Sequence, residues 1–322
     1  MTERVLLVGA GEIASVYADV LRCLSVQFDA CCVSADSARR FGEKHAVQCY
    51  AGGLEQLCHS GGGAGYSHAI VALPVSGLSK AAELLLSHGV ENVLVEKPAG
   101  MDAKEVCTLV ERVGAEKAEK HCFVAYNRRF YASVMAAERA IAEDGGVTSF
   151  SFDFTELSDR LRLGGIDAVL LEKWEYANST HVIDTAFFLA GTPARMSCIK
   201  AGSLDIHPDA ARYAGVGETI NKVPFTYTAD WDAPGRWGIE INTRKRKLVL
   251  RPVEQLSVQH RNSFAMEPMA LADDSDERFK PGYFRQVQAF VTGADRHRLL
   301  SLAGQATQLA LFSKTIFQGG GL

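Results

Sequence analysis

Three features are missing from this chain, and each absence excludes a class of protein. No apolar run is long enough to cross a membrane, which argues against a membrane protein. No long basic run occurs and the formal net charge is −4, so a nucleic-acid partner is not expected. The short basic stretch from Arg244 to Lys247 is expected to be a hairpin turn. The eight cysteines include no CxxC pair, which favours free, mostly buried thiols in a reducing cytoplasm.

Signals for secretion, metal binding and internal repetition are also missing. Residues Val5 to Gly9 have the pattern of a short strand rather than the apolar core of a signal peptide. The histidines are dispersed, and neither HxxxH nor a Cys–His ligand spacing occurs, so no metal site is predicted. A length of 322 residues with 47% hydrophobic and 22% charged residues favours an ordinary globular protein of two domains.

The two parts of the chain differ in their hydrophobic periodicity. The first part alternates strands and helices, which is typical of a doubly wound parallel sheet. We expect strands at 5–8, 30–34, 68–72, 92–95 and 121–125, and helices at 12–23, 38–45, 54–58, 78–88 and 103–117. The later part begins with a helix at 131–143 and then shows period-two alternation, which favours an antiparallel sheet with one wet face. We expect its strands at 148–156, 194–201, 225–231, 238–242 and 247–250, a helix around 181–187, and helices again at 283–292 and 299–317.

The first strand leads into a glycine-containing turn, Gly9-Ala10-Gly11-Glu12-Ile13-Ala14. In such a turn Gly9 would allow a sharp change of direction, and Gly11 would let backbone amides approach a pyrophosphate. Ala14 replaces a third glycine and still permits close packing of helix on strand. The start of the following helix adds the positive end of its dipole. The motif therefore predicts a dinucleotide site.

The choice between NAD and NADP depends on the end of the second strand. An acidic residue there would bind the ribose 2′-hydroxyl of NAD. Ser34 stands at the expected position, with Asp36 nearby and Arg39 and Arg40 following. A small hydroxyl followed by arginines suits a 2′-phosphate, so the pattern favours NADP, with NAD as the alternative. The two arginines are also compatible with a solvated helix face.

The run Val93-Leu94-Val95-Glu96-Lys97-Pro98 is a buried strand that ends in a Glu-Lys-Pro turn. A lysine at the carboxyl end of a parallel strand stands where open α/β sheets bind their ligands. An amine near a cationic nicotinamide would have a lowered pKa, which suits it to proton transfer. The combination with the glycine turn indicates an oxidoreductase, and the alternative for Lys97 is a surface ion pair with Glu96.

With these motifs, the chain resembles the glucose-fructose oxidoreductase/inositol dehydrogenase (Gfo/Idh/MocA) family over nearly its whole length. The resemblance lies in the glycine turn, Ala72-Leu73-Pro74, Glu96-Lys97-Pro98, Tyr126-Asn127-Arg128-Arg129-Phe130 and His181-Val182-Ile183-Asp184. It implies an α/β protein with a Rossmann domain (1–125) and a C-terminal α/β domain (126–322) with a large open, mostly antiparallel sheet. The last helices would pack back on the Rossmann domain. The resemblance also implies a homodimer or homotetramer formed through that sheet.

The same resemblance implies roles for individual residues. Lys97 and His181 match the residues that act on the substrate hydroxyl, and Pro98 matches a turn proline that can be cis. His181 alternatively has a capping role on a helix face. The predicted cofactor contacts are Gly9, Gly11, Glu12, Ile13, Ser34, Arg39, Leu73, Pro74, Glu96 and Lys97. The predicted substrate contacts are Tyr126, Asn127, Arg128, Asn178 and Asp184, with Tyr283 and Gln286 as further candidates.

The chain also departs from the family pattern. Ala177 stands where the family carries an aspartate one turn before the histidine, and Asn178 and Glu175 do not match it in register. Leu73 replaces the usual threonine before Pro74. The expected function is hydride transfer between NAD(P) and a hydroxyl or ketone of a sugar, sugar nucleotide or cyclitol. The alternatives are a cofactor-binding regulatory or scaffold protein with little or no activity, and a lyase or hydrolase that uses NAD transiently.

Overall fold

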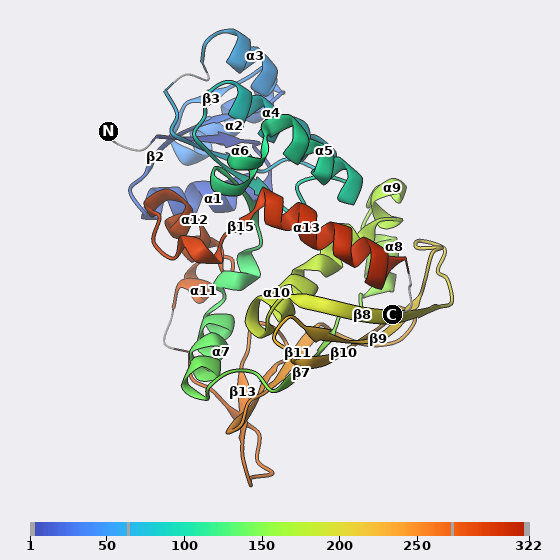
Figure 1. Ribbon diagram of the computed structural model, residues 1–322. Coiled ribbons are helices and arrows are strands. Elements are labelled where there is room, and N and C mark those ends of the chain that lie inside the picture. Colours follow the sequence, from blue (N-terminus) through green and yellow to red (C-terminus); the bar gives the residue numbers. More distant parts are fainter. Residues whose placement is uncertain (1–3, 63–64, 272–273, 319–322) are drawn as a thin grey trace. The chain divides into compact units, whose positions relative to one another are not determined.

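The computed structural model describes residues 4–62, 65–271 and 274–318. The chain divides into two units (Figure 1). The first unit consists of Met1–Asn127 and Ser275–Leu309, and the second of Arg128–Asp274 and Ala310–Leu322. The first unit thus contains a late segment of the chain in addition to residues 1–125. None of the helices in the described ranges is both long and apolar enough to cross a lipid bilayer.

A seven-stranded sheet forms the centre of the first unit. Its strands, in spatial order, are β15 (Leu300–Ser301), β6 (Cys122–Ala125), β5 (Asn92–Glu96), β4 (His68–Val71), β1 (Arg4–Val8), β2 (Gln27–Cys31) and β3 (Cys49–Tyr50). All neighbours pair in parallel except β15, which is antiparallel to β6. The central strands are apolar and buried because helices cover both faces of a doubly wound sheet. The predicted parallel α/β fold is confirmed.

Helices connect these strands. They are α1 (Glu12–Cys23), α2 (Ala35–His45), α3 (Gly53–His59), α4 (Val75–Ser87), α5 (Ala103–Val113) and α6 (Ala115–Lys120). The late segment adds α11 (Ser275–Arg278), α12 (Tyr283–Thr292), a 3-10 turn at Arg296–Arg298 and most of α13 (Leu302–Phe312). The single helix expected at 103–117 is wrong, because Gly114 divides it into α5 and α6. Gly114 has φ of 87°, a backbone conformation that favours glycine.

The second strand begins and ends earlier than the sequence pattern predicts. We expected residues 30–34, whereas β2 spans Gln27–Cys31. The polar Asp29 interrupts the apolar pattern by which a buried strand is predicted. In the structure Asp29 is nearly buried, because its carboxylate accepts hydrogen bonds from Arg4 at 2.5 Å and from Tyr66 at 2.6 Å. At the other end Val33 is 80% exposed and lies outside the strand. The burial of Asp29 in the strand therefore depends on partners that are distant in the sequence.

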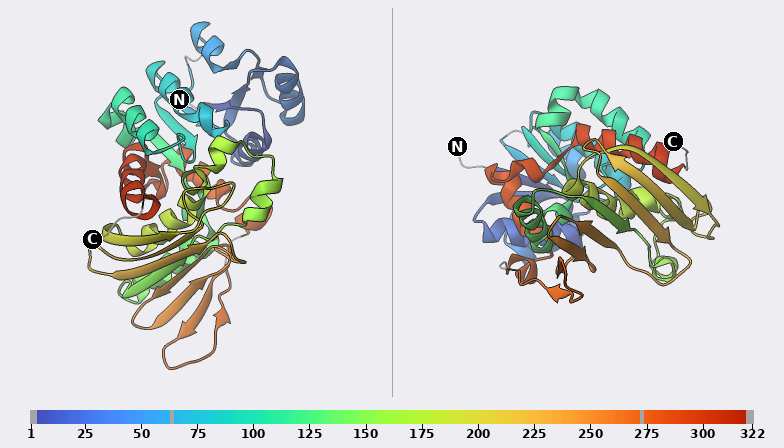
Figure 2. Two further views of the ribbon diagram at one scale, coloured as in Figure 1. Left: turned by 90° about the vertical axis from the view of Figure 1, so that its right-hand side faces the viewer. Right: turned by 60° about the horizontal axis from the view of Figure 1, so that its bottom comes forward.

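An eight-stranded sheet forms the second unit (Figure 2). Its order is β14 (Glu267–Pro268), β13 (Ser257–His260), β12 (Arg246–Leu250), β11 (Gly238–Asn242), β7 (Ser149–Asp153), β10 (Pro224–Asp230), β9 (Arg212–Thr219) and β8 (Pro193–Ala201). All pairs are antiparallel except β7 with β10. The helices are α7 (Ala132–Glu143), α8 (Ser158–Leu163), α9 (Ala168–Leu171) and α10 (Thr180–Ala190), with 3-10 residues Asn127–Phe130 and π-helical residues Glu175–Ser179 and Ser313–Phe317.

One face of this sheet is the core of the second unit. Along β10 the residues alternate, with Phe225 and Tyr227 buried and Thr226 and Thr228 exposed. Helix α10 packs against β7 and β11 on the buried face, and its residues are almost all buried. The mostly antiparallel sheet with one wet face is confirmed.

Strand β9 has no counterpart among the predicted strands. Its sequence contains Gly215 and Gly217, which weaken a strand signal. In the sheet they stand opposite Tyr227 and Phe225, and a Cβ on either glycine would lie 2.1–2.5 Å from those rings. The glycines are therefore required by the aromatic side chains of the neighbouring strand, a reason that local sequence does not contain.

Candidate functional site

A pocket of about 430 Å³ opens at the carboxyl ends of strands β1, β2, β4 and β5 of the first unit. The strand order reverses between β1 and β4, which is where open α/β sheets bind their ligands. Eight of the predicted cofactor contacts line this pocket: Gly9, Gly11, Glu12, Ile13, Leu73, Pro74, Glu96 and Lys97. The volume lies within the usual range of ligand sites.

The two glycines of the turn have different structural reasons. Gly9 has φ of +124°, and a Cβ on it would lie 2.3 Å from the carbonyl oxygen of Ala72. A Cβ on Gly11, by contrast, would meet no described atom within 4 Å. Gly11 directly precedes α1, whose first backbone amides have no side-chain cap. Gly9 therefore serves the fold, while Gly11 leaves room for an anionic group to approach the start of the helix.

Glu96, on the pocket wall at the end of β5, is held by two tyrosines. Its Oε1 accepts hydrogen bonds from the hydroxyls of Tyr17 at 2.7 Å and Tyr283 at 3.2 Å. The two tyrosine rings are buried and their centroids are 5.0 Å apart. Burial, and then the charge of Glu96, raise the pKa of Tyr17, so it remains a donor. The carboxylate is therefore fixed in orientation.

Lys97 follows in a tight turn and is partly buried on the same wall. The turn is closed by a hydrogen bond from the Ala99 amide to the Glu96 carbonyl at 3.1 Å, and the Lys97–Pro98 peptide is cis. The side chain of Gln305 donates to the Pro98 carbonyl at 3.1 Å. The strand end and this turn together place the lysine at the pocket.

The end of the pocket beside β2 contains residues that the sequence reasoning missed. These are Cys32, Val33, Gly53 and Leu54. Their apolar character gave no signal, because only a carboxylate was sought at this position.

Two predicted cofactor contacts, Ser34 and Arg39, are not among the residues that line the pocket. Ser34 is the N-cap of α2, and its hydroxyl accepts from the Ser37 amide at 3.4 Å. Arg39 lies on the exposed part of α2, with carboxylate oxygens of Asp36 and Glu43 at 3.9 and 3.5 Å.

Tyr126 and Asn127 are buried in the first unit. The Tyr126 hydroxyl is 3.0 Å from the side-chain nitrogen of Gln305, and the Asn127 amide donates to the Pro281 carbonyl at 2.9 Å. Gln286 is fully buried as well. Neither Tyr126 nor Asn127 lines the pocket at the ends of β1, β2, β4 and β5. The described hydrogen bonds of these two side chains connect them to the late segment of the chain, at Gln305 and Pro281.

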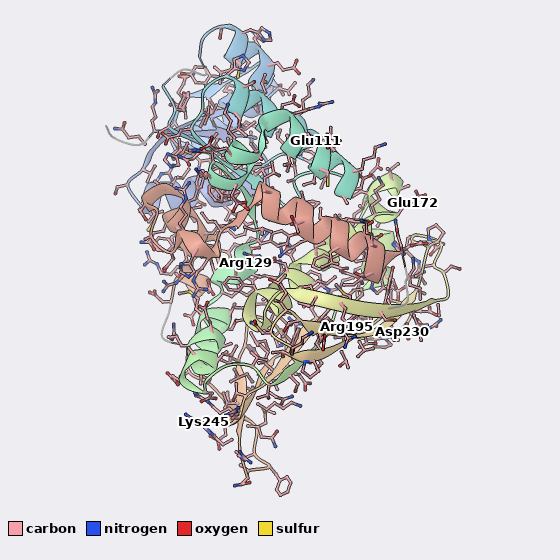
Figure 3. The ribbon with its side chains drawn as sticks, in the orientation of Figure 1. Glu111, Arg129, Glu172, Arg195, Asp230 and Lys245 are labelled. Carbon is pink, nitrogen blue, oxygen red and sulfur yellow. The ribbon has the colours of Figure 1, made fainter. Side chains whose placement is uncertain are left out.

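The other predicted residues lie in the second unit. Asp184 is fully buried and forms a two-bond ion pair with Arg129, so its carboxylate is not on a pocket wall. Arg129, labelled in Figure 3, lies in the 3-10 turn before α7. The guanidinium of Arg128 stands 4.7 Å from the ring centroid of Trp237. His181 is 5% exposed, and its ring centroid is 6.2 Å from that of Trp237. Arg128 and His181 therefore share one neighbour.

A pocket of about 280 Å³ in this unit includes Trp237 and Glu156 in its wall. The side chain of Asn178 donates to both carboxylate oxygens of Glu156, at 3.2 and 3.1 Å. Three predicted residues thus contact two wall residues that were not predicted. Glu156 ends the stretch predicted as a strand, and no motif marked it.

The segment before His181 is π-helical, Glu175–Ser179, and contains the buried Ala177. Glu175 is held by His207, whose Nε2 is 2.7 Å from the carboxylate. Burial lowers the pKa of His207, but the hydrogen bond and charge of Glu175 outweigh it, and the pKa is raised. Glu175 is therefore committed to a buried pair. Single-turn π-helices are frequent near functional sites.

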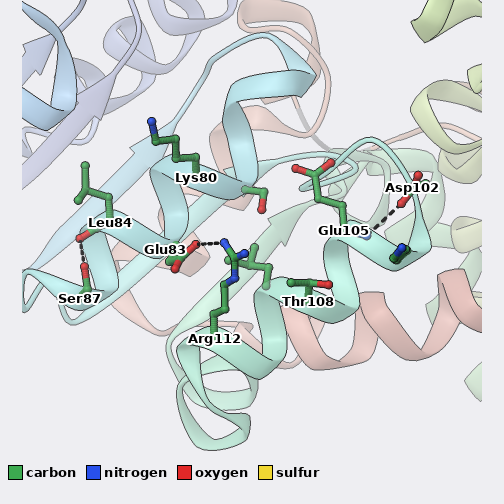
Figure 4. A pocket seen from close by; sticks show the side chains of 11 residues that line it. Lys80, Glu83, Leu84, Ser87, Asp102, Glu105, Thr108 and Arg112 are labelled. Carbon is green, nitrogen blue, oxygen red and sulfur yellow. Dashed lines mark hydrogen bonds and ion pairs between the residues drawn. The ribbon is translucent and has the colours of Figure 1, made fainter.

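A further hollow lies between α4 and α5 of the first unit (Figure 4). Arg112 and Glu83 form an ion pair there at 3.1 Å, and Asp102 caps α5. None of the predicted site residues lines it, and it shares no lining residue with the pocket at the strand ends.

No protein-family model matches the chain, and no curated protein matches it in sequence. Solved structures match it closely in fold. An oxidoreductase from Agrobacterium radiobacter in complex with NAD+, L-tartaric acid and magnesium gives a TM-score of 0.75 at 15% identity, covering 98% of this chain and 95% of that one. A UDP-N-acetylglucosamine 3-dehydrogenase from Acidithiobacillus ferrooxidans gives 0.71 at 15% identity, covering 96% of both chains. Levoglucosan dehydrogenase with NADH and L-sorbose gives 0.74 at 16% identity, covering 96% of this chain and 94% of that one. The chain therefore has the fold of these oxidoreductases over almost its entire length.

Proposed function

We propose that this protein is an NAD(P)-dependent oxidoreductase that interconverts a hydroxyl and a ketone on a sugar, sugar nucleotide or cyclitol. The observation that carries the proposal is the pocket that Lys97 shares with the glycine turn, Gly9 to Ile13. The names of the structures similar in fold, which include sugar and sugar-nucleotide dehydrogenases, support the same class of substrate.

The residues present fit a dinucleotide. The open space beside Gly11 and the uncapped amides of α1 suit a pyrophosphate. A bound nicotinamide would supply or accept the hydride. Glu96, oriented by Tyr17 and Tyr283, would position the nicotinamide end.

Lys97 would hold the substrate oxygen and move its proton, because an amine whose pKa falls beside a positive charge suits both directions of the reaction. We propose that His181 hydrogen-bonds the substrate hydroxyl, and that Tyr126, Asn127, Arg128, Asn178 and Asp184 contribute to the substrate site directly or through their neighbours.

For the finer cofactor choice we propose a preference for NADP. Cys32 and Val33 at the end of β2 offer no carboxylate to a ribose 2′-hydroxyl. The side chain of Arg39 is 62% exposed, and its two long ion pairs are of the kind that contribute little. It can therefore leave them for a 2′-phosphate.

We also propose a homodimer or homotetramer in a reducing cytoplasm. All eight cysteines are free thiols. The apolar Ile199 and Val216 are 72% and 53% exposed on neighbouring strands of the wet sheet face. Light scattering would detect the assembly, and Ile199→Lys should weaken it.

Absorbance of the reduced nicotinamide, followed across a panel of sugars, sugar nucleotides and cyclitols, tests the function. Lys97→Ala should keep cofactor affinity and reduce turnover by about 10²- to 10⁴-fold, the usual contribution of general acid–base catalysis. Lys80→Ala, an exposed lysine on α4, is the control. Tight cofactor binding with no turnover on any compound would favour a regulatory or scaffold protein instead.

A further inference from the structure

The basic stretch of the sequence, which the proposed function does not use, lines a second pocket of the second unit. As expected, the stretch forms a hairpin turn: β11 and β12 pair antiparallel, and Lys245, labelled in Figure 3, lies in the turn between them. The pocket has a volume of about 540 Å³. Its permanently positive lining residues are Arg244, Lys245, Arg246, Lys247 and Arg261. Among the described residues that line it, none is acidic and none is apolar.

Two neighbouring hairpins, β11–β12 and β13–β14, bring these cations together. In the β12–β13 pair, Arg246 stands opposite His260. One position further, the Arg261 amide donates to the Lys245 carbonyl at 2.9 Å. The Arg261 guanidinium donates to the Arg244 carbonyl at 3.3 Å, so it lies against the backbone of the other arginine. Like charges on neighbouring strands oppose the folding of a sheet, and a bound anion would offset that repulsion.

Three of the five cations have carboxylate partners outside the pocket wall. Arg246 forms ion pairs with two carboxylates at the end of α7, both at 2.8 Å. The Lys247 amine lies 2.6 Å from a carboxylate oxygen of Glu240. The side chain of Lys245 is 66% exposed, and its amine is 3.8 Å from Asp144, so this ion pair is long and weak. These carboxylates neutralise only part of the charge of the pocket.

Arg244 and Arg261 keep their full positive charge. Both residues are exposed, and within the described ranges neither guanidinium forms an ion pair with a carboxylate. An arginine has five N–H donors in a planar fork. The described bond of Arg261 to a backbone carbonyl therefore leaves donors for two parallel hydrogen bonds to a phosphate group, the geometry in which arginine binds phosphate best.

We propose that this pocket binds a short polyphosphate chain, either inorganic or part of a nucleotide. Arg244 and Arg261 each bind one phosphate group through two hydrogen bonds, and the exposed amine of Lys245 adds a third cation. A chain of phosphates fits better than a single phosphate, because the cations come from two hairpins. A long polyanion fits less well, because the protein has a net charge of −4 and repels it outside the pocket. The pocket shares no lining residue with the one that contains Lys97, so this site is additional to the proposed function.

Calorimetric titration of the full-length protein, at low ionic strength and without divalent cations, tests this assignment. The probes are inorganic phosphate, inorganic triphosphate and ATP. Triphosphate should bind at least about tenfold more tightly than phosphate, because it reaches both arginines, and added salt should weaken its binding. ATP can also enter the pocket of the first unit, so only the part of its binding that the variants below remove belongs to this site. That part decides between the two sources: ATP equal to triphosphate indicates the phosphate chain alone, and tighter ATP indicates a nucleotide.

Two double variants separate charge from geometry. Arg244→Gln with Arg261→Gln should weaken triphosphate binding by about tenfold or more and leave NAD(P) affinity unchanged. Arg244→Lys with Arg261→Lys keeps both charges but loses the planar fork, so its affinity should lie between those of the wild type and the glutamine variant. Arg195→Gln removes an exposed arginine of the same sheet, at β8, and is the control, with triphosphate affinity like that of the wild type. Thermal unfolding checks that each variant is folded, and all the replaced side chains belong to exposed residues.

The assignment is overturned if triphosphate binds no more tightly than phosphate, or if the folded glutamine variant binds triphosphate as the wild type does. A loss in Arg195→Gln as large as that in the glutamine variant would trace binding to the net charge of the protein and would overturn it as well. These measurements do not depend on hydride transfer. A protein that binds triphosphate as described but never reduces or oxidises NAD(P) would disprove the proposed function and leave this site standing.

Discussion

Arg129 and Asp184 form a buried ion pair in the second unit, with Nε to Oδ2 at 2.8 Å and Nη2 to Oδ1 at 2.5 Å. Their side chains are 7% and 0% exposed. The guanidinium also lies 4.8 Å from the ring centroid of Phe188. The pair joins the 3-10 turn that precedes α7 to the centre of α10. It therefore holds in place the helix that carries His181.

Removal of one partner of this ion pair should strongly lower the stability of the protein. Asp184→Asn leaves the Arg129 charge buried without its carboxylate, and we expect the free energy of unfolding to fall by about 3–5 kcal/mol. Urea denaturation measures it. The pair Arg195–Glu218, at 2.9 Å with side chains 64% and 20% exposed, is the control, and Glu218→Gln should change stability far less. Equal losses in the two variants would contradict a special role of burial.

The glycine turn offers a pair of substitutions with opposite effects. Gly9→Ala places a methyl group against the Ala72 carbonyl at a left-handed backbone conformation, so it should lower the melting temperature. Gly11→Val places its side chain in open space, so it should leave stability unchanged and weaken NAD(P) binding by at least about tenfold, because it fills the pyrophosphate approach. Thermal unfolding and cofactor titration separate the two. Unchanged cofactor affinity in Gly11→Val would place the pyrophosphate elsewhere.

Most elements of the first unit could be predicted from the sequence because the patterns that indicate them are local. Strand β5 and the Glu-Lys-Pro turn follow from a continuous apolar run and a proline, and α1 and α12 have their predicted bounds. The strands that the sequence analysis missed or misplaced depend on contacts between residues that are distant in the sequence. Strand β9 is explained only by the contact of Gly215 and Gly217 with the rings of β10. Strand β2 is explained only by the ion pair of Asp29 with Arg4 and the hydrogen bond that Tyr66 donates to Asp29.

The same distinction applies to the candidate site. The glycine turn and Lys97 carry motifs, so they could be predicted from sequence. Glu156 could not, because the residues that orient it, Asn178 and Ser179, lie more than twenty positions later in the chain. Asp184 was predicted as a substrate contact from the family resemblance, and only the fold shows that Arg129 forms an ion pair with its carboxylate.

Two neighbouring arginines on α2 test the cofactor preference. Arg39→Ala should raise the dissociation constant for NADP by about tenfold or more and leave that for NAD nearly unchanged, because a charge-assisted contact to the 2′-phosphate is lost. Arg40→Ala, the adjacent exposed arginine, is the control. Fluorescence titration with both cofactors gives the ratio. A protein that prefers NAD, or an unaltered ratio in Arg39→Ala, contradicts the assignment.

The buried pair of Glu175 and His207 should make stability depend on pH. Glu175 raises the pKa of His207 above its ordinary value of 6.5, so the native state binds the proton more tightly than the unfolded chain does. The stabilisation is fully present below pH 6.5 and is lost as pH rises through the native pKa. The wild type should therefore lose stability with rising pH relative to His207→Gln, in which this titration is absent.

Other titratable groups change the pH dependence of stability of each protein, but they do not change the difference between the wild type and His207→Gln. Arg246 lowers the pKa of Asp144, so the stabilisation from Asp144 is complete above its unfolded value and constant from pH 6 to 9. Burial lowers the pKa of His45, so its contribution runs in the opposite direction, and stability gains as pH rises towards 6.5. Both groups are shared by the wild type and His207→Gln. Between pH 6 and 9, the unfolding free energy of the wild type minus that of His207→Gln, measured by urea denaturation, should fall from pH 6.5 up to the native pKa of His207 and stay constant above it. A difference that does not change with pH would mean that folding leaves the pKa of His207 unshifted.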